Sequence, residues 1–145
     1  MKCATAYKRK EKIYFHSSSR TTAGVWIITG PFLSIEDCAQ PSDKGDCVKE
    51  VLKSSKEGIT HPKSWGNLFE PILDIAGVKS WAVFVKSAMS CFIELENDEL
   101  RFIPNRNLGP REGYKPIRER TLITSYNTPI ENIGNMLDCA FKACE

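Results

Sequence analysis

The chain has 145 residues, of which 41% are hydrophobic, 10% aromatic and 26% charged, and its formal net charge at pH 7 is +2. This length and composition fit one domain with its own hydrophobic core. They exclude an intrinsically disordered chain and a surface built throughout for nucleic acid. The small net charge conceals a segregation along the sequence: residues 1–20 and 101–120 together carry twelve basic and three acidic residues, and the rest of the chain carries eight basic and fifteen acidic residues.

No segment predicts a membrane span or a cleaved signal. The longest apolar run, residues 81–85, is far shorter than the ~20 residues of a transmembrane helix or the ~7–15 apolar residues of a signal peptide. We therefore expect a cytoplasmic protein, and in a reducing compartment cysteines are more often thiols than disulfides. The six thiols expected on this basis are Cys3, Cys38, Cys47, Cys91, Cys139 and Cys144.

The first half of the chain begins with a predicted hairpin. Residues 12–16 and 24–29 are aromatic and β-branched, which favours strands, and the Ser/Thr-rich residues 17–22 between them have the composition of a turn. Gly30-Pro31 is expected to break the chain before a short edge strand over residues 32–35.

A helix is predicted next, over residues 43–57. Ser42 is its expected N-cap, Asp43 and Asp46 lie in the first turn where the helix dipole favours acidic groups, and Gly58 is the expected stop.

The middle of the chain predicts two short helices followed by a hairpin. Apolar residues have helical spacing over residues 67–76, and Gly77 is expected to end this helix. Ser80 is placed to cap a second short helix. Residues 91–96 and 99–104 then alternate apolar and polar side chains around Asn97-Asp98, a pattern typical of an antiparallel hairpin.

The last third predicts a long loop over residues 106–115, a strand over residues 121–126 and a closing helix. Thr128, Pro129 and Glu131 form an N-cap, a first-turn proline and a capping box, so a helix is expected from Pro129 nearly to the end of the chain. Together these elements predict a single α+β domain over residues 1–145. Its sheet is expected to be mixed or largely antiparallel, with about five strands and three to four packed helices.

The sequence offers no recognised catalytic or metal-binding pattern. There are two histidines, His16 and His61, no CxxC and no glycine-rich phosphate loop, and a spacing of five on a helix turns Cys139 and Cys144 away from each other. We therefore predict no catalytic residue, no metal and no cofactor. A thiol-dependent enzyme or redox sensor that uses Cys3 or Cys144 remains an alternative.

Acidic residues supply the candidate binding surfaces. One group lies at the end of the predicted hairpin and a second lies on the predicted first helix, and either group would steer a partner with a basic face. Trp65, between polar residues, is a candidate exposed anchor. The hairpin group is Glu94, Glu96, Asp98 and Glu99, and the helix group is Asp43, Asp46 and Glu50.

Basic residues gather in the later part of the chain, where Tyr114 lies among Arg101, Arg106, Arg111, Lys115, Arg118 and Arg120. Such a segment can follow a phosphate backbone while one base stacks on the tyrosine. The alternative function is therefore an RNA-binding or RNA-processing protein that uses residues 106–120.

Several short stretches of the chain form recognisable phrases. They are residues 17–22 followed by Gly24 and Trp26; His61-Pro62 with Ser64-Trp65; residues 76–81 with Phe84 and Lys86; Ile103-Pro104 with residues 106–109 and Gly113-Tyr114; and the closing Ala143-Cys144-Glu145. In these stretches the chain resembles the immunity proteins of bacterial contact-dependent growth inhibition (CDI) systems, the CdiI family.

The resemblance implies a cytoplasmic inhibitor rather than an enzyme. Its expected partner is the C-terminal toxin domain, commonly a nuclease, that a neighbouring cell delivers. An acidic surface would complement the basic face with which a nuclease holds nucleic acid. No membrane or nucleic-acid partner is expected, and outside its complex the protein is expected to be a monomer.

Overall fold

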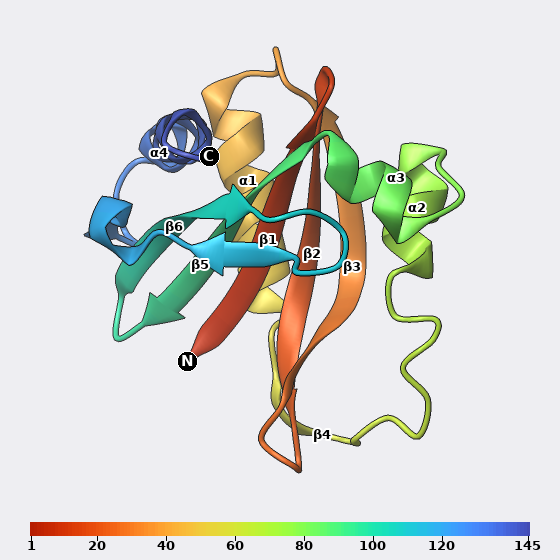
Figure 1. The fold of residues 1–145 in the computed structure, drawn as a ribbon. Helices are drawn as coiled ribbons and strands as arrows, with labels where there is room; N and C mark the ends of the chain where they lie inside the picture. Colours follow the sequence, from red (N-terminus) through yellow and green to blue (C-terminus); the bar gives the residue numbers. More distant parts are fainter.

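The centre of the fold is an eight-stranded sheet with helices against both faces, here described from a computed structural model that covers residues 1–145 (Figure 1). The main path runs β3-β2-β1-β5-β6-β7, with β4 beside β2 and β8 beside β6. The strands are β1 Lys2–Arg9, β2 Lys12–Thr21, β3 Trp26–Glu36, β4 Glu57–Ile59, β5 Ala88–Glu96, β6 Glu99–Asn107, β7 Tyr114–Pro116 and β8 Leu122–Ser125.

Only the β2–β4 pair is parallel, so the predicted α+β class with a largely antiparallel sheet is confirmed. The expectation of about five strands was too low.

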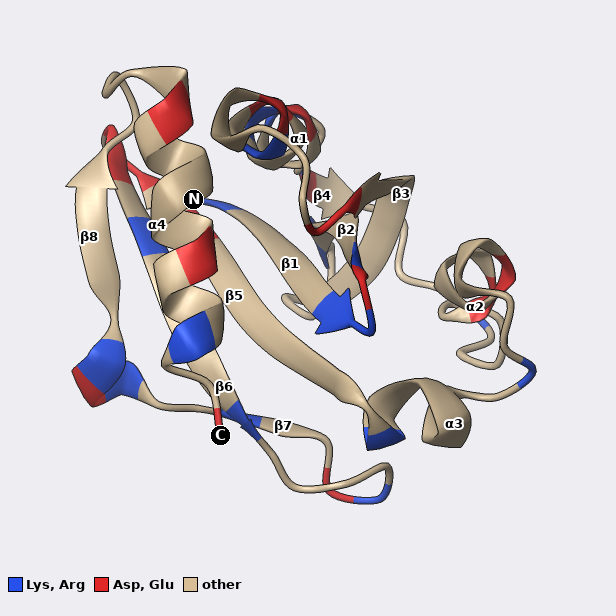
Figure 2. Cartoon of the chain, turned by 90° about the horizontal axis from the view of Figure 1, so that it is seen from above, with Lys and Arg blue, Asp and Glu red and all other residues tan.

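Four helices complete the fold, as predicted: α1 Pro41–Lys53, α2 Glu70–Ala76, α3 Trp81–Lys86 and α4 Ile130–Lys142, with the 3₁₀ turn Arg118–Arg120 before β8. Figure 2 shows α1 and α4 side by side on one face of the sheet, and α2 and α3 at one end of the other face. No helix combines the length and the apolar character that a bilayer crossing requires.

Strand β1 has no counterpart among the predicted elements, although it is a central strand. It pairs with β2 on one side and β5 on the other. Its sequence contains one β-branched residue, Thr5, and two small ones, Ala4 and Ala6, so local propensity is weak. Pairing on both edges, rather than propensity, makes this segment a strand.

The turn predicted over residues 17–22 is wrong, because β2 continues to Thr21. The hydroxyls that suggested a turn are used inside the sheet: Ser19 and Thr29 are hydrogen-bonded at 2.9 Å between their hydroxyl oxygens. The Thr21 hydroxyl accepts bonds from the backbone N–H groups of Ala23 and Val25 and so holds the real turn.

The break predicted at Gly30-Pro31 is also wrong. The two predicted strands, residues 24–29 and 32–35, are parts of the continuous edge strand β3, and the irregularity appears as a bulge opposite His16 and Ser17.

The ends of α1 differ from the prediction. It begins at Pro41, with Gln40 as N-cap and no side-chain cap, so Ser42 is not the cap. It ends at Lys53, before Gly58, which lies in β4. Proline suits the first helical position because it has no N–H to satisfy there, and the Gln40 carbonyl accepts from the backbone N–H groups of Asp43 and Lys44 at 3.0 and 3.2 Å.

The predictions for α2, α3 and the Asn97-Asp98 hairpin are confirmed, although α2 begins at Glu70, three residues later than predicted. Gly77 ends α2 in the left-handed conformation (φ 70°), and the Ser80 hydroxyl caps α3 by accepting the Val83 N–H. Asn97 and Asp98 have φ of 51° and 63°, as a tight hairpin turn requires.

Near the C-terminus, the predicted loop 106–115 is partly β structure, because β7 pairs with the end of β6. The predicted last strand is present as β8. Helix α4 starts at Ile130 without a side-chain cap, so the predicted capping box is wrong; the Thr128 hydroxyl accepts a bond from the Asn132 amide instead.

The core consists of two clusters, one on each face of the sheet. The larger lies under α1 and α4 and includes Phe15, Ile93 and Leu137. The smaller lies under α2 and α3 and includes Tyr7 and Phe84. Because α2 and α3 are short and lie at one end, they leave part of the second face uncovered.

Candidate partner-binding site

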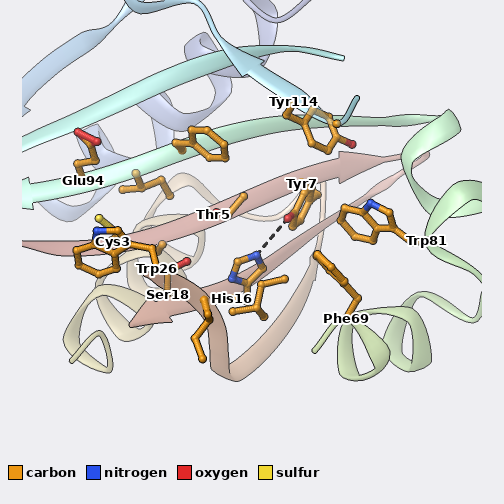
Figure 3. Close-up of a pocket in the computed structure, with 16 residues that line it drawn as sticks. Cys3, Thr5, Tyr7, His16, Ser18, Trp26, Phe69, Trp81, Glu94 and Tyr114 are labelled. Atoms are coloured by element: carbon orange, nitrogen blue, oxygen red, sulfur yellow. Dashed lines mark hydrogen bonds between the residues drawn. The ribbon is translucent and has the colours of Figure 1, made fainter. Parts of the chain in front are cut away.

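The uncovered part of the second sheet face forms an open pocket of about 480 Å³. Eleven of its sixteen lining residues are hydrophobic, and they come from β1, β2, β3 and β5 and from the segments around α2, α3 and β7 (Figure 3). A pocket of this size and apolar character is the usual form of a binding site.

Strand alternation explains which side chains reach this face. In β1, Ala4 and Ala6 belong to the core under α1 and α4, so Cys3, Thr5 and Tyr7 point the other way. The neighbouring strands contribute in the same manner, and their lining residues on this face are His16 and Ser18 of β2, Trp26 and Ile28 of β3, and Phe92 and Glu94 of β5.

Aromatic rings form one end of the pocket. Trp81 packs against Phe69 with ring centroids 4.2 Å apart and meets Tyr7 edge-on at 5.9 Å. Tyr114 approaches Tyr7 from the other side, and its hydroxyl donates to the Ala88 carbonyl at 2.8 Å. These contacts fix the rings in place, so the pocket wall is preorganised.

The floor contains a buried Tyr7–His16 pair (Figure 3). His16 Nδ1 lies 2.8 Å from the Ser17 carbonyl, which can only accept, so Nδ1 carries the proton and Nε2 accepts from the Tyr7 hydroxyl at 3.1 Å. Burial lowers the pKa of His16 from 6.5 to about 4 and raises the pKa of Tyr7. Both side chains are therefore neutral at pH 7.

The hairpin acidic group lies beside this pocket. Glu94 lines the pocket, and Glu94, Glu96 and Glu99 share the single guanidinium of Arg101 at 3.8, 4.0 and 3.2 Å. Asp98 makes no ion pair. The structure thus brings the four predicted hairpin carboxylates to one place, with one cation among them.

The other predicted binding residues lie elsewhere. Asp43, Asp46 and Glu50 are exposed on α1, on the opposite face of the sheet from the pocket. Trp65 is 47% exposed and packs edge-on against His61, at a centroid distance of 5.3 Å, in the segment between β4 and α2. The structure does not bring these residues to the pocket.

Sequence reasoning missed most of the pocket lining, including Tyr7, His16, Trp26 and Phe92. The missed strand β1 is the main cause, since it places Tyr7 beside His16. The alternation of residues 91–96 did place Phe92 and Glu94 on one face, which is the signal that could have located this site.

The basic segment is partly neutralised. Arg106 and Arg120 both reach the Glu145 carboxylate, at 3.0 and 2.9 Å. Arg111, Lys115 and Arg118 make no ion pair. Tyr114 is half-buried against Tyr7, so its ring is not an open platform for a base.

No group of three or more histidine, cysteine or acidic side chains is arranged to hold a metal ion. All six cysteines are free thiols. Burial raises the pKa of Cys3, in the pocket, to about 11, and nearby Glu94 adds to this effect, so its thiol is protonated at neutral pH. The pocket offers aromatic surface and one carboxylate, a combination suited to binding.

Comparisons with known proteins identify the family of this chain and solved structures with the same fold. The family model for the CDI immunity protein, CdiI, matches residues 2–144. Two solved structures share the fold over 99% of this chain: "Protein of Unknown Function NMB0488 from Neisseria meningitidis" (17% identity, TM-score 0.81, 95% of that chain) and a chain of "CdiA-CT/CdiI toxin and immunity complex from Yersinia pseudotuberculosis" (16% identity, TM-score 0.81, 97% of that chain). No curated protein matches the sequence. Because the family model covers nearly the whole chain, this protein belongs to the family of CDI immunity proteins.

Proposed function

We propose that this chain binds the C-terminal toxin domain of a CDI system and neutralises it by protein–protein inhibition, without catalysis. The observation that carries the proposal is the open aromatic pocket in a chain that matches the immunity family from residue 2 to residue 144. The similar chain from Yersinia pseudotuberculosis was solved as part of a toxin and immunity complex, which supports a toxin domain as the partner here.

The shape of the pocket determines what kind of contact it can make. A concave site needs a convex partner element, so we expect the toxin to insert a protruding segment. Aromatic side chains in a desolvated pocket typically dominate the binding energy of an interface. Fixed rings also lose little conformational freedom on binding, so the wall formed by Trp81, Phe69 and Tyr114 is well suited to this role.

We further propose that the toxin is a nuclease and that neutralisation takes place in the cytoplasm. A nuclease presents a basic face to its substrate. In the hairpin group, Glu94, Glu96 and Glu99 share one guanidinium, and the fourth carboxylate, Asp98, makes no ion pair. This excess negative charge beside the pocket supports the hairpin group as part of the interface. The α1 group, Asp43, Asp46 and Glu50, is the second candidate.

The direct test uses the purified chain and the toxin domain encoded beside its gene. We expect a one-to-one complex on size-exclusion chromatography and loss of toxin activity on nucleic acid at equimolar protein. Full toxin activity with an excess of the chain would refute the proposal. A complex with a toxin that leaves nucleic acid intact but has another activity would refute only its nuclease part.

The RNA-binding alternative makes a different prediction. Arg111, Lys115 and Arg118 have no ion-pair partner, so RNA binding through residues 106–120 would weaken with salt and on Arg111→Ala replacement. Toxin neutralisation that is unchanged in Arg111→Ala, together with no measurable RNA binding by the wild type, is the result that our proposal expects.

A further inference from the structure

We infer that the pocket receives an arginine side chain from the protruding segment of the toxin, and that Glu94 is the counter-ion of that arginine. This inference rests on the proposed function. It specifies the chemistry of the inserted segment and assigns a specificity-determining role to one residue.

Glu94 is the only charged residue among the sixteen that line the pocket. Its side chain is 17% exposed, so it is shielded from solvent, and eleven of the residues that line the pocket with it are hydrophobic. A charge in such surroundings interacts more strongly with a counter-ion than one on an open surface, because water screens it less. The pocket therefore favours a partner group that is cationic and carried on an apolar stem.

The internal cation does not satisfy Glu94. Arg101 is the only basic residue paired with the hairpin group, and its shortest ion-pair distance is the 3.2 Å contact with Glu99, while Glu94 lies 3.8 Å away. Glu96 is also within 4.0 Å of the same guanidinium. With three carboxylates sharing one cation, negative charge remains for a second cation at the pocket.

The aromatic residues complete the match. Figure 3 shows Trp26 at the same end of the pocket as Glu94 and Cys3, with Tyr7, Trp81 and Phe69 toward the other end. A carboxylate at the same end of a pocket as an aromatic residue suits an arginine, because a planar guanidinium can donate to carboxylate oxygens and pack on aromatic faces. No positive group in the lining opposes this: the nearby His16 is neutral and Cys3 is a protonated thiol.

The first experiment needs no toxin. Nα-acetyl-arginine amide is titrated into the protein while the indole N–H signals are followed by NMR, with Trp65, outside the pocket, as internal reference. We expect the Trp26 signal to move with arginine amide but not with Nα-acetyl-glutamine amide, and Glu94→Gln to weaken the response about tenfold or more. Glu131→Gln, which removes an exposed carboxylate on α4, on the opposite face of the sheet from the pocket, should leave it unchanged.

Equal responses to the arginine and glutamine probes, or an unchanged response in Glu94→Gln, would overturn the inference.

The second experiment repeats the comparison with the toxin domain. Glu94→Gln should bind about tenfold or more weakly than the wild type, and the control Glu131→Gln within about threefold of it, at equal melting temperature. Suppose that replacing other pocket-lining residues abolishes tight toxin binding but Glu94→Gln keeps it. This result would overturn the arginine inference and leave the proposed function intact. A wild type that binds no toxin would remove the proposed function, while the probe titration would still decide whether the pocket selects a cation.

Discussion

At the scale of single residues, His16 is the buried group with the clearest consequence for stability. It is 1% exposed, and its two hydrogen bonds fix it as the neutral Nδ1–H form. Its folded-state pKa of about 4 lies below the 6.5 of an unperturbed histidine. Between these values the unfolded chain takes up a proton that the folded chain does not.

The free energy of unfolding should therefore fall as the pH is lowered from about 6.5 to about 4, by about 3 kcal/mol at most from this residue. Above pH 6.5 this contribution to stability is fully present. Chemical denaturation of the wild type and of His16→Gln at several pH values measures it. The difference in stability between the two proteins should shrink as the pH falls, and a difference that is constant from pH 7 to pH 4 would show that His16 is not the cause.

The six thiols should differ in reactivity. Cys38 and Cys139 are exposed, whereas burial raises the pKa of Cys3 and of Cys47 to about 11. Relative to the ordinary value of 9.0, this shift leaves about a hundredfold less thiolate, the form that reacts.

Brief treatment with iodoacetamide at pH 8, followed by mass spectrometry, should modify Cys38 and Cys139 well before Cys3 and Cys47. Modification of Cys3 as fast as Cys139 would contradict the burial of Cys3. Toxin neutralisation that survives full alkylation of the exposed thiols would also argue against a function based on their chemistry.

Site residues that local interactions bring together could be predicted from the sequence, whereas those brought together by contacts between distant segments could not. The acidic hairpin group was found because its members are close in sequence and a local pattern puts them at one hairpin end. The Tyr7–His16 pair was not found, because it depends on the register between β1 and β2, which no local pattern encodes.

At the scale of elements, the contact between α1 and α4 depends on two glycines. A Cβ atom on Gly134 would collide with the Pro41 carbonyl oxygen, and one on Gly45 with the Ile130 carbonyl oxygen. These neighbours are backbone atoms and cannot move aside as a flexible side chain could. The helices therefore pack closely enough for the buried Lys44 of α1 to reach Asp138 of α4 at 3.0 Å.

Gly134→Ala should lower the free energy of unfolding by about 3 kcal/mol, despite the better helix propensity of alanine. The matched control is Gly66→Ala, because a Cβ at Gly66 would meet only the Ser64 hydroxyl at 3.9 Å. That variant should stay within about 0.5 kcal/mol of the wild type. Urea denaturation compares the two, and equal stability of both variants would mean that the helices are not in close contact at Gly134.

The elements that the sequence predicted well carry their own signals. Helix α2 ends at Gly77, helix α3 is capped by Ser80, and the β5–β6 hairpin turns at Asn97-Asp98. The errors lie where tertiary contacts override composition. The Ser/Thr-rich end of β2 is a strand because its hydroxyls bond across the sheet, and Gly30-Pro31 is accommodated in an edge strand at a bulge.

At the scale of the whole molecule, the charge segregation seen along the sequence is partly offset by ion pairs formed on folding. Basic residues of the N-terminal segment pair with acidic ones from later elements, as in Lys8–Asp37 and Arg20–Glu57. Figure 2 shows basic and acidic segments next to each other on α1 and at the 3₁₀ turn. The excess negative charge that remains beside the pocket belongs to the hairpin group. A basic partner is therefore expected at this end of the pocket.

The central claim is that the open pocket is the surface that neutralises the toxin. Ile28 tests it well, because this side chain lines the pocket but belongs to neither core cluster. Ile123, on β8 and 56% exposed, allows the same substitution outside the pocket.

The decisive measurement is a calorimetric titration of the toxin domain into the wild type, Ile28→Lys and Ile123→Lys, after circular dichroism has shown all three to be folded. We predict one-to-one binding by the wild type, at least about thirtyfold weaker binding by Ile28→Lys, and nearly unchanged binding by Ile123→Lys. Wild-type affinity in Ile28→Lys would contradict the account, because a long cationic side chain in the pocket would fill the space of the partner segment and repel its arginine.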